Sequence, residues 1–144
     1  MKLSWQTVHL HLTDPFGISR ETKTVKRNVI ARVTDGVHTG LGEAAPSPFY
    51  GQSEETVLKA LEEAGQTLVE GGDDPEELIG ALARICPADL AARVALDIAL
   101  HDLTARRAHL PLHDYLGISG EIAAPTSFTI GIDSPEVMMD KLRS

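Results

Sequence analysis

Histidines and carboxylates at short spacings are the residues of this chain that could bind a metal or move a proton. The sequence has six histidines, and His9 and His11 stand two residues apart. On a strand, that spacing would place both imidazoles on one face. A zinc site needs three or four ligands, and no cysteine or carboxylate accompanies this pair at a fixed spacing. We therefore interpret the pair as an exposed strand face and predict no metal site in the chain.

Two further pairs have the i, i+4 spacing of neighbours on a helix surface. They are Asp97 with His101 and Asp102 with Arg106. This spacing is typical of hydrogen bonds and ion pairs between side chains on one helix face. We interpret both pairs in that way, and neither is predicted to do chemistry.

The sequence motifs that mark a complete active site are missing. Gly40-Leu41-Gly42 precedes no predicted helix and lacks the third glycine of a phosphate-binding loop. Ser119 follows Gly117 in a Gly-x-Ser-Gly run, but nothing organises a base beside it as a nucleophile elbow requires. The single cysteine, Cys86, stands in an apolar context and is expected to be a buried, unreactive thiol. We predict no catalytic residue in this chain.

Composition and charge exclude several classes of protein. The formal net charge is −8, whereas binding to nucleic acid needs a basic surface. No stretch approaches the roughly 20 apolar residues of a membrane span, and the first residues do not form a signal-peptide core. With 42% hydrophobic residues, the chain has the composition of a folded domain, which we expect in the cytoplasm.

Alternating apolar residues predict a sheet in the first third of the chain. We expect a strand over residues 3–13, a turn over 14–17 and a polar loop over 18–27. A second strand is expected over 25–34 and a third over 37–44, joined by a hairpin turn at Asp35-Gly36. Consecutive strands joined in this way predict a three-stranded antiparallel meander.

Capping residues and 3.6-residue periodicity predict three helices after the sheet. Ser53 is expected to cap the first and Asp74-Pro75 to begin the second. The third, over residues 88–107, is apolar around much of its circumference, so we expect it to be buried on more than one side. An apolar strand is then predicted over 126–132, followed by a helix capped by Ser134, which together read as the first βα unit of a barrel.

Several stretches within this order of elements resemble the enolase superfamily, in its muconate-lactonizing subgroup. The closest resemblance is to the N-terminal part of dipeptide epimerases of the L-Ala-D/L-Glu type. It rests on PFGISR at 15–20, NVIARV at 28–33, GLGEAAPSP at 40–48, ALDIALHDL at 95–103, LPLHDYLG at 110–117 and TSFTI at 126–130. The resemblance covers essentially the whole chain. It implies an α+β fold, with a capping domain over residues 1–120 and the start of a truncated TIM-like barrel over 121–144.

The resemblance also implies which residues face a substrate. In such enzymes two loops of the capping domain cover the pocket, and here they would be residues 15–23 and 45–53. Arg20 is the candidate partner of a substrate carboxylate, because a guanidinium matches a carboxylate well, and a one-residue slip in the alignment leaves Lys23 as the alternative. Further substrate contacts are implied for Phe16, Ile18, Phe49, Tyr50 and Thr129.

The implied activity is epimerisation or racemisation of a dipeptide, or of an acylated amino acid, by removal and return of an α-proton. The family uses Mg²⁺, two lysines and three acidic ligands on later barrel strands, so we expect all of these beyond Ser144. Glu43 is expected to form structural hydrogen bonds rather than bind metal. We expect this chain alone to bind no Mg²⁺ and to be inactive, and the complete protein to form a homo-oligomer. A cycloisomerase, an o-succinylbenzoate synthase and a non-catalytic standalone module are the alternatives.

Overall fold

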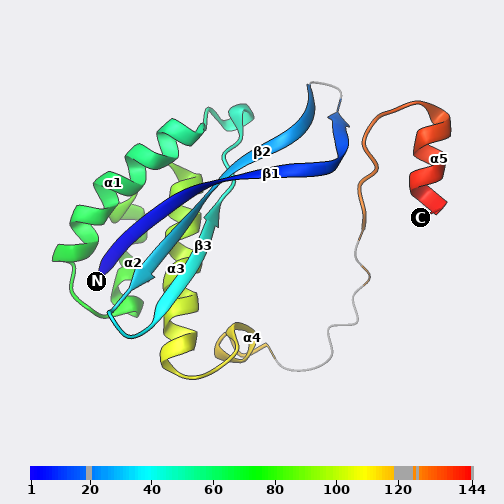
Figure 1. Ribbon diagram of the computed structural model, residues 1–144. Helices are drawn as coiled ribbons and strands as arrows, with labels where there is room; N and C mark the ends of the chain where they lie inside the picture. The colour runs from blue at the N-terminus through cyan, green and yellow to red at the C-terminus, as the bar shows by residue number, and fades with distance from the viewer. Residues whose placement is uncertain (19–20, 119–124, 126, 144) are drawn as a thin grey trace. The chain divides into compact units, whose positions relative to one another are not determined.

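The computed structural model describes residues 1–18, 21–118, 125 and 127–143. Its strands are β1 (Lys2–Ile18), β2 (Glu21–Thr34) and β3 (Thr39–Ala44), followed by a short 3-10 helix, η1 (Pro48–Tyr50). The α-helices are α1 (Glu54–Glu70), α2 (Pro75–Ile85), α3 (Leu90–Arg107), α4 (Leu112–Tyr115) and α5 (Pro135–Arg143). Figure 1 shows these elements along the chain.

The chain divides into two compact units. The larger unit comprises Met1–Val8 and Arg27–Ser119, and the smaller unit comprises His9–Lys26 and Gly120–Ser144. The long β1–β2 hairpin contributes to both. The predicted domain boundary between residues 120 and 121 remains a prediction.

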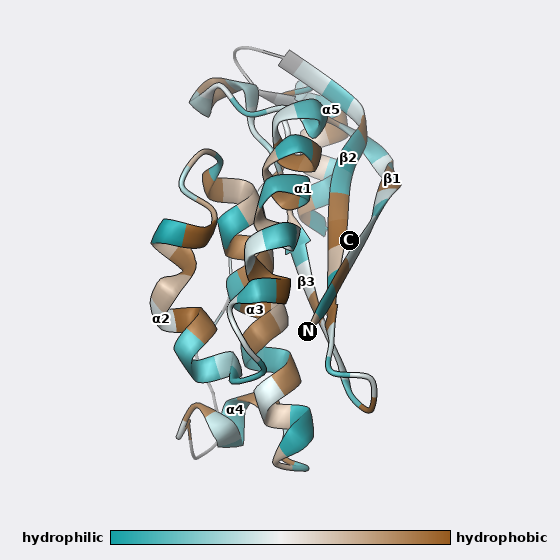
Figure 2. Ribbon diagram, turned by 90° about the vertical axis from the view of Figure 1, so that its left-hand side faces the viewer, coloured by the Kyte–Doolittle hydropathy of each residue, from teal (hydrophilic) through white to brown (hydrophobic). Residues whose placement is uncertain are grey.

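The larger unit is a sheet covered on one face by helices, as Figure 2 shows for α1, α2 and α3. The strand order is β1-β2-β3 among the described residues, and the sheet is antiparallel. The register of β2 and β3 pairs Val29 with Ala44 and Thr34 with Thr39. The alternation read from the sequence is confirmed, because the side chains that β2 turns toward the helices are fully buried: Val29, Ala31 and Val33. The predicted α+β architecture is therefore correct.

Two glycines let α3 lie directly on β3. A Cβ added to Gly40 would overlap the carbonyl oxygen of Ala99, and one added to Gly42 would overlap that of Ala95. Both glycines were expected within a strand, without a phosphate-binding role. Their role in the fold is to remove the side chains that would hold the helix and the strand apart.

The predicted helix caps are confirmed. Ser53 accepts a hydrogen bond from the backbone N–H of Thr56 and forms a capping box with it, and Asp74 accepts one from Glu76. The third helix is buried on more than one side, as predicted, because it packs against both β3 and α2, although Val94 and Ile98 remain 44% and 39% exposed.

The β1–β2 hairpin corrects the prediction of a turn at 14–17 and a loop over 18–27. Strand β1 continues to Ile18 and β2 already begins at Glu21. Pro15 is compatible with this because β1 is an edge strand, where a missing N–H interrupts no ladder if it points outward. The pairing of β1 with β2 therefore outweighs the preference of the Asp-Pro dipeptide for a turn.

The last part of the chain confirms a helix and corrects a strand. Val137 donates its backbone N–H to Ser134 Oγ at 3.4 Å, so Ser134 caps α5 as predicted. Residues 127–132 are not a strand, although their residue types favour one. Strand structure requires a ladder with a neighbour, and the described residues of this segment form none.

Among the described residues, no helix combines the length and apolar character needed to cross a bilayer.

Candidate functional site

The tip of the hairpin and the segment before α5 meet within the smaller unit. Ile132 donates its backbone N–H to the carbonyl oxygen of Gly17 at 2.8 Å. A Cβ on Gly17 would lie 2.8 Å from the Ile132 oxygen, and one on Gly131 would lie 3.0 Å from the Gly17 nitrogen. The absence of both side chains therefore allows the two backbones to touch.

Two of the predicted substrate residues stand close to this contact along the chain. The half-buried Phe16 precedes Gly17, and its Cα would lie 3.5 Å from a Cβ on Gly131. Thr129 stands two residues before Gly131 and is exposed. Gly131 was not among the predicted site residues. The rule that marks strand glycines as points of close backbone approach could have found it.

A lysine on α5 pairs with carboxylates from both sides of this contact. Lys141 Nζ lies 3.9 Å from Asp14 Oδ1 and 3.9 Å from Asp133 Oδ2. Both carboxylates are substantially exposed, so each pair contributes little stability by itself. The arrangement nevertheless ties α5 to β1 within the smaller unit.

The basic residues predicted to meet a substrate carboxylate are placed only in part. Arg20 lies outside the described residues, and the side chain of Ile18 is also not described. Lys23 is half-buried on β2. The choice between Arg20 and Lys23 therefore stays a prediction.

The second predicted loop lies in the larger unit, between β3 and α1. It contains η1, which is followed by Gly51 as its C-cap. Gly51 has a φ of +70°, a conformation that suits glycine. Phe49 and Tyr50 are 66% and 75% exposed, and their rings contact each other edge to face at 4.9 Å between centroids. The loop thus presents two aromatic rings at the surface of this unit. Phe49 and Tyr50 were both expected on this loop, whereas the bond between the Gln52 side chain and Ser47 across the loop was not expected.

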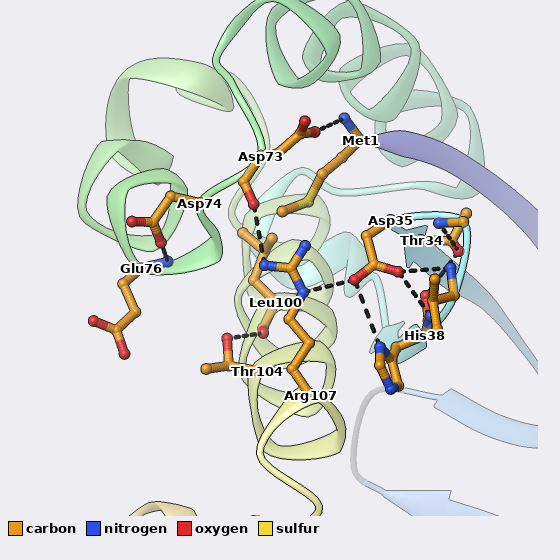
Figure 3. Close-up of polar contacts among 12 residues, drawn as sticks. Met1, Thr34, Asp35, His38, Asp73, Asp74, Glu76, Leu100, Thr104 and Arg107 are labelled. Carbon is orange, nitrogen blue, oxygen red and sulfur yellow. Dashed lines mark hydrogen bonds and ion pairs between the residues drawn. The ribbon is translucent and has the colours of Figure 1, made fainter.

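The most connected polar cluster is structural. The Asp35 carboxylate accepts hydrogen bonds from the backbone N–H of His38 at 2.7 Å and of Val37 at 2.8 Å, and from Arg107 Nε at 2.6 Å. These donors, the His38 N–H foremost, hold the pKa of Asp35 well below its ordinary value. Arg107 also donates to the Asp73 carbonyl oxygen at 3.1 Å, and Asp73 pairs with the N-terminal amine of Met1 at 3.0 Å (Figure 3). The cluster joins the β2–β3 turn, the end of α3 and the chain start.

The acidic residues considered in the sequence analysis have structural partners as well. Glu43 accepts a 2.6 Å hydrogen bond from the buried Asn28 side chain, which confirms its expected structural role. Asp102 accepts from Arg106 Nε at 3.0 Å and from the backbone N–H of Leu41 at 2.9 Å. Asp97 lies 3.8 Å from His101, so both i, i+4 pairs form as predicted.

The described residues contain no group of three side chains that could hold a metal ion. His9 and His11 are exposed on β1. Cys86 is buried as predicted, and this burial raises the pKa of its thiol above the ordinary value. The described residues therefore do not fit a magnesium or zinc site.

The chain is similar in sequence to proteins of a known family. Residues 2–117 match the family described as mandelate racemase / muconate lactonizing enzyme, N-terminal domain. The chain is 32% identical to an L-Ala-D/L-Glu epimerase of Bacteroides thetaiotaomicron, with 99% of this chain and 37% of that protein covered. It is 38% identical to a hydrophobic dipeptide epimerase of a Flavobacteria bacterium, covering 99% of this chain and 40% of that protein.

The same similarity holds in three dimensions. The structure of a dipeptide epimerase from Methylococcus capsulatus, complexed with Mg and the dipeptide L-Arg-D-Lys, superposes with a TM-score of 0.86 at 35% identity. The match covers 99% of this chain and 41% of that one. The chain thus spans about two fifths of the length of the relatives it matches.

Proposed function

The chain belongs to the mandelate racemase / muconate lactonizing enzyme family through its N-terminal domain, and we propose that it caps the substrate of a dipeptide epimerase. The proposed substrates are dipeptides of the Ala-Glu type or acylated amino acids. In the proposed reaction the complete protein, with Mg²⁺, removes an α-proton and returns it to the opposite face.

One observation carries this proposal. Similarity to dipeptide epimerases extends over 99% of the chain, in sequence and in fold, rather than over a short motif. The relatives differ in the dipeptides named for them, so the similarity supports the reaction more firmly than it supports the substrate.

Within this proposal the chain supplies recognition. The exposed pair Phe49 and Tyr50 would provide an apolar wall on one loop. Phe16 and Thr129 would also contact the substrate, and Arg20, or Lys23 in its place, would pair with a substrate carboxylate.

The chain does not supply the chemistry. Proton transfer at a carbon needs an acid and a base placed on its two faces. The described residues contain no group of three side chains that could hold a metal ion, and we propose no metal ligand among them. We also propose that none of them carries out a proton transfer. We therefore propose that these 144 residues alone have no epimerase activity.

Activity assays with several candidate substrates test the proposed function. The protein expressed from its complete coding region, called the whole protein below, is offered L-Ala-L-Glu, a panel of other dipeptides, a muconate and the precursor of o-succinylbenzoate. Epimerisation of a dipeptide without turnover of the other two supports the proposal. Turnover of the muconate or of the o-succinylbenzoate precursor alone would replace it with the corresponding alternative.

Two charge-neutral variants decide which cation meets the carboxylate. Arg20→Met is expected to raise KM for L-Ala-L-Glu by about tenfold or more, because a charge-assisted hydrogen bond is lost. Lys23→Met is expected to leave KM within about twofold of the parent, because in this assignment Lys23 does not contact the substrate. The reverse pattern would assign the contact to Lys23.

A further inference from the structure

Loop 45–53, which carries Phe49 and Tyr50, is anchored to rigid elements at both ends. It follows β3, where the Asn28 side chain holds Glu43 at 2.6 Å. It leads into α1, whose first turn is held by the 2.7 Å hydrogen bond from Thr56 Oγ1 to Asp89 Oδ2. Asp89 is only 5% exposed and also caps α3 through the backbone N–H of Ala92. The shape of the loop between these anchors must come from its own bonds.

Gln52 closes the loop by bonding twice to Ser47. Its backbone N–H donates to the Ser47 carbonyl oxygen at 3.1 Å, and its side-chain Oε1 accepts the Ser47 N–H at 3.2 Å. The Ser47 oxygen also accepts the N–H of Tyr50 at 3.0 Å. Both backbone groups of Ser47 are therefore bound to Gln52, and the residues between them form a closed ring of bonds.

The Ser47 N–H is the part of this ring that depends on a side chain. Ser47 is half-buried and stands between Pro46 and Pro48, which have no N–H of their own. Without the Gln52 oxygen, the Ser47 N–H would lose its partner in a partly desolvated place, which is unfavourable. The loop would then relax toward a shape that exposes this N–H to water, and the two aromatic rings would move with it.

We infer that Gln52 is a positioning residue for substrate recognition, acting through Ser47 to fix the orientation of Phe49 and Tyr50. The inference rests on the proposed function, because it takes the two rings to face the substrate. It assigns to the Gln52 amide oxygen a role in binding, and none in proton transfer.

Two substitutions in the whole protein separate the oxygen from the shape of the side chain. Gln52→Met keeps the length but removes the acceptor, and it is expected to raise KM for the dipeptide about tenfold while kcat stays within about twofold. Gln52→Glu keeps an acceptor oxygen and is expected to retain the parent KM. Gln66→Met, on the exposed face of α1, is the matched control and should change neither parameter. An unchanged KM in Gln52→Met, or an equal rise in Gln52→Glu, would overturn the inference.

A second measurement tests the role of the Gln52 oxygen even if the whole protein epimerises no dipeptide. It is hydrogen exchange, followed by mass spectrometry on the peptide covering residues 45–53. Gln52→Met is expected to speed exchange in this peptide at least about tenfold, and Gln52→Glu is expected to keep the parent rate. Unchanged exchange in Gln52→Met would show that the oxygen does not hold the loop. Absence of epimerisation with fast exchange in Gln52→Met would reject the proposed substrate role and, with it, the recognition part of the inference.

Discussion

In both units, glycines allow two backbone segments to come into contact. The packing around the two contacts differs. In the larger unit, the buried Gly40 and Gly42 lie against Ala99 and Ala95 of α3, which belong to the hydrophobic core. In the smaller unit, Gly17 and Gly131 meet at the end of a hairpin, beside an exposed segment.

The surroundings decide how much each contact can contribute to stability. Around the first contact, Leu96, Leu100 and Leu103 are completely buried. Within the described part of the smaller unit, no side chain of α5 is buried, and Phe128 and Leu142 are 85% and 68% exposed. Loop 45–53 is therefore attached to elements that pack around a buried core, whereas the predicted substrate residues of the smaller unit stand on elements with few buried contacts.

The largest effect is expected where the glycine is backed by the core. Gly42→Ala should lower the free energy of unfolding by about 3 kcal/mol, because the new Cβ overlaps the Ala95 carbonyl and forces α3 away from β3. Urea unfolding followed by circular dichroism measures the loss. Gly80→Ala is the control, since a Cβ there meets nothing within 4 Å on helix α2, and a gain of about 0.5–1 kcal/mol is expected. Equal effects of the two substitutions would contradict the role of close packing.

A smaller loss is expected from the carboxylate that joins two helix starts. Asp89→Ala removes the acceptor of both Thr56 Oγ1 and the Ala92 N–H, and should destabilise the larger unit by about 1–2 kcal/mol. The change should appear in the same urea experiment, with faster amide exchange in the first turns of α1 and α3. If exchange rose in α3 alone, the bond to Thr56 would have no stabilising role.

Asp35 gives the larger unit a dependence on pH. The pKa of Asp35 is lower in the folded state than in the unfolded chain. Its charge therefore stabilises the fold fully above about pH 4, where Asp35 is ionised in both states. This contribution is lost as the pH falls further, because the unfolded chain then binds the proton first. Asp35→Asn should therefore lower the unfolding midpoint clearly at pH 7, and the difference from the parent should shrink toward pH 2.5. A difference that stays constant between those two pH values would count against the charge as its cause.

The smallest effect on global stability is expected from the other glycine contact. Gly131→Ala should change the free energy of unfolding by less than about 0.5 kcal/mol, because few buried contacts depend on it. The amide of Ile132 should nevertheless lose protection from exchange, since the new Cβ presses on the Gly17 nitrogen. A global loss as large as that of Gly42→Ala would remove the distinction between the two units.

Local rules predicted the parts of the fold that depend on neighbouring residues. The caps at Ser53 and Asp74 and the buried face of β2 follow from hydrogen-bonding groups and alternation within a few positions. The length of the hairpin and the state of residues 127–132 depend on which strands are available to pair, and the sequence of one segment does not contain that information.

The candidate site was predictable mainly through family resemblance. Phe16, Tyr50 and Thr129 were selected by resemblance to known motifs, and the loop that bears Tyr50 indeed presents it at the surface. Gln52 was missed because a glutamine in a turn has no distinctive spacing, and its bond to Ser47 becomes visible only in three dimensions.

Exchange of the substrate α-proton with solvent tests the central claim most directly. The whole protein is incubated with Mg²⁺ and L-Ala-L-Glu in heavy water, and the α-proton of the glutamate residue is followed by NMR. We expect this signal to disappear while the diastereomeric dipeptide accumulates with deuterium at the same carbon. A folded whole protein that exchanges no α-proton in L-Ala-L-Glu or in hydrophobic, lysine- and arginine-containing dipeptides would contradict the claim that this chain caps a dipeptide epimerase.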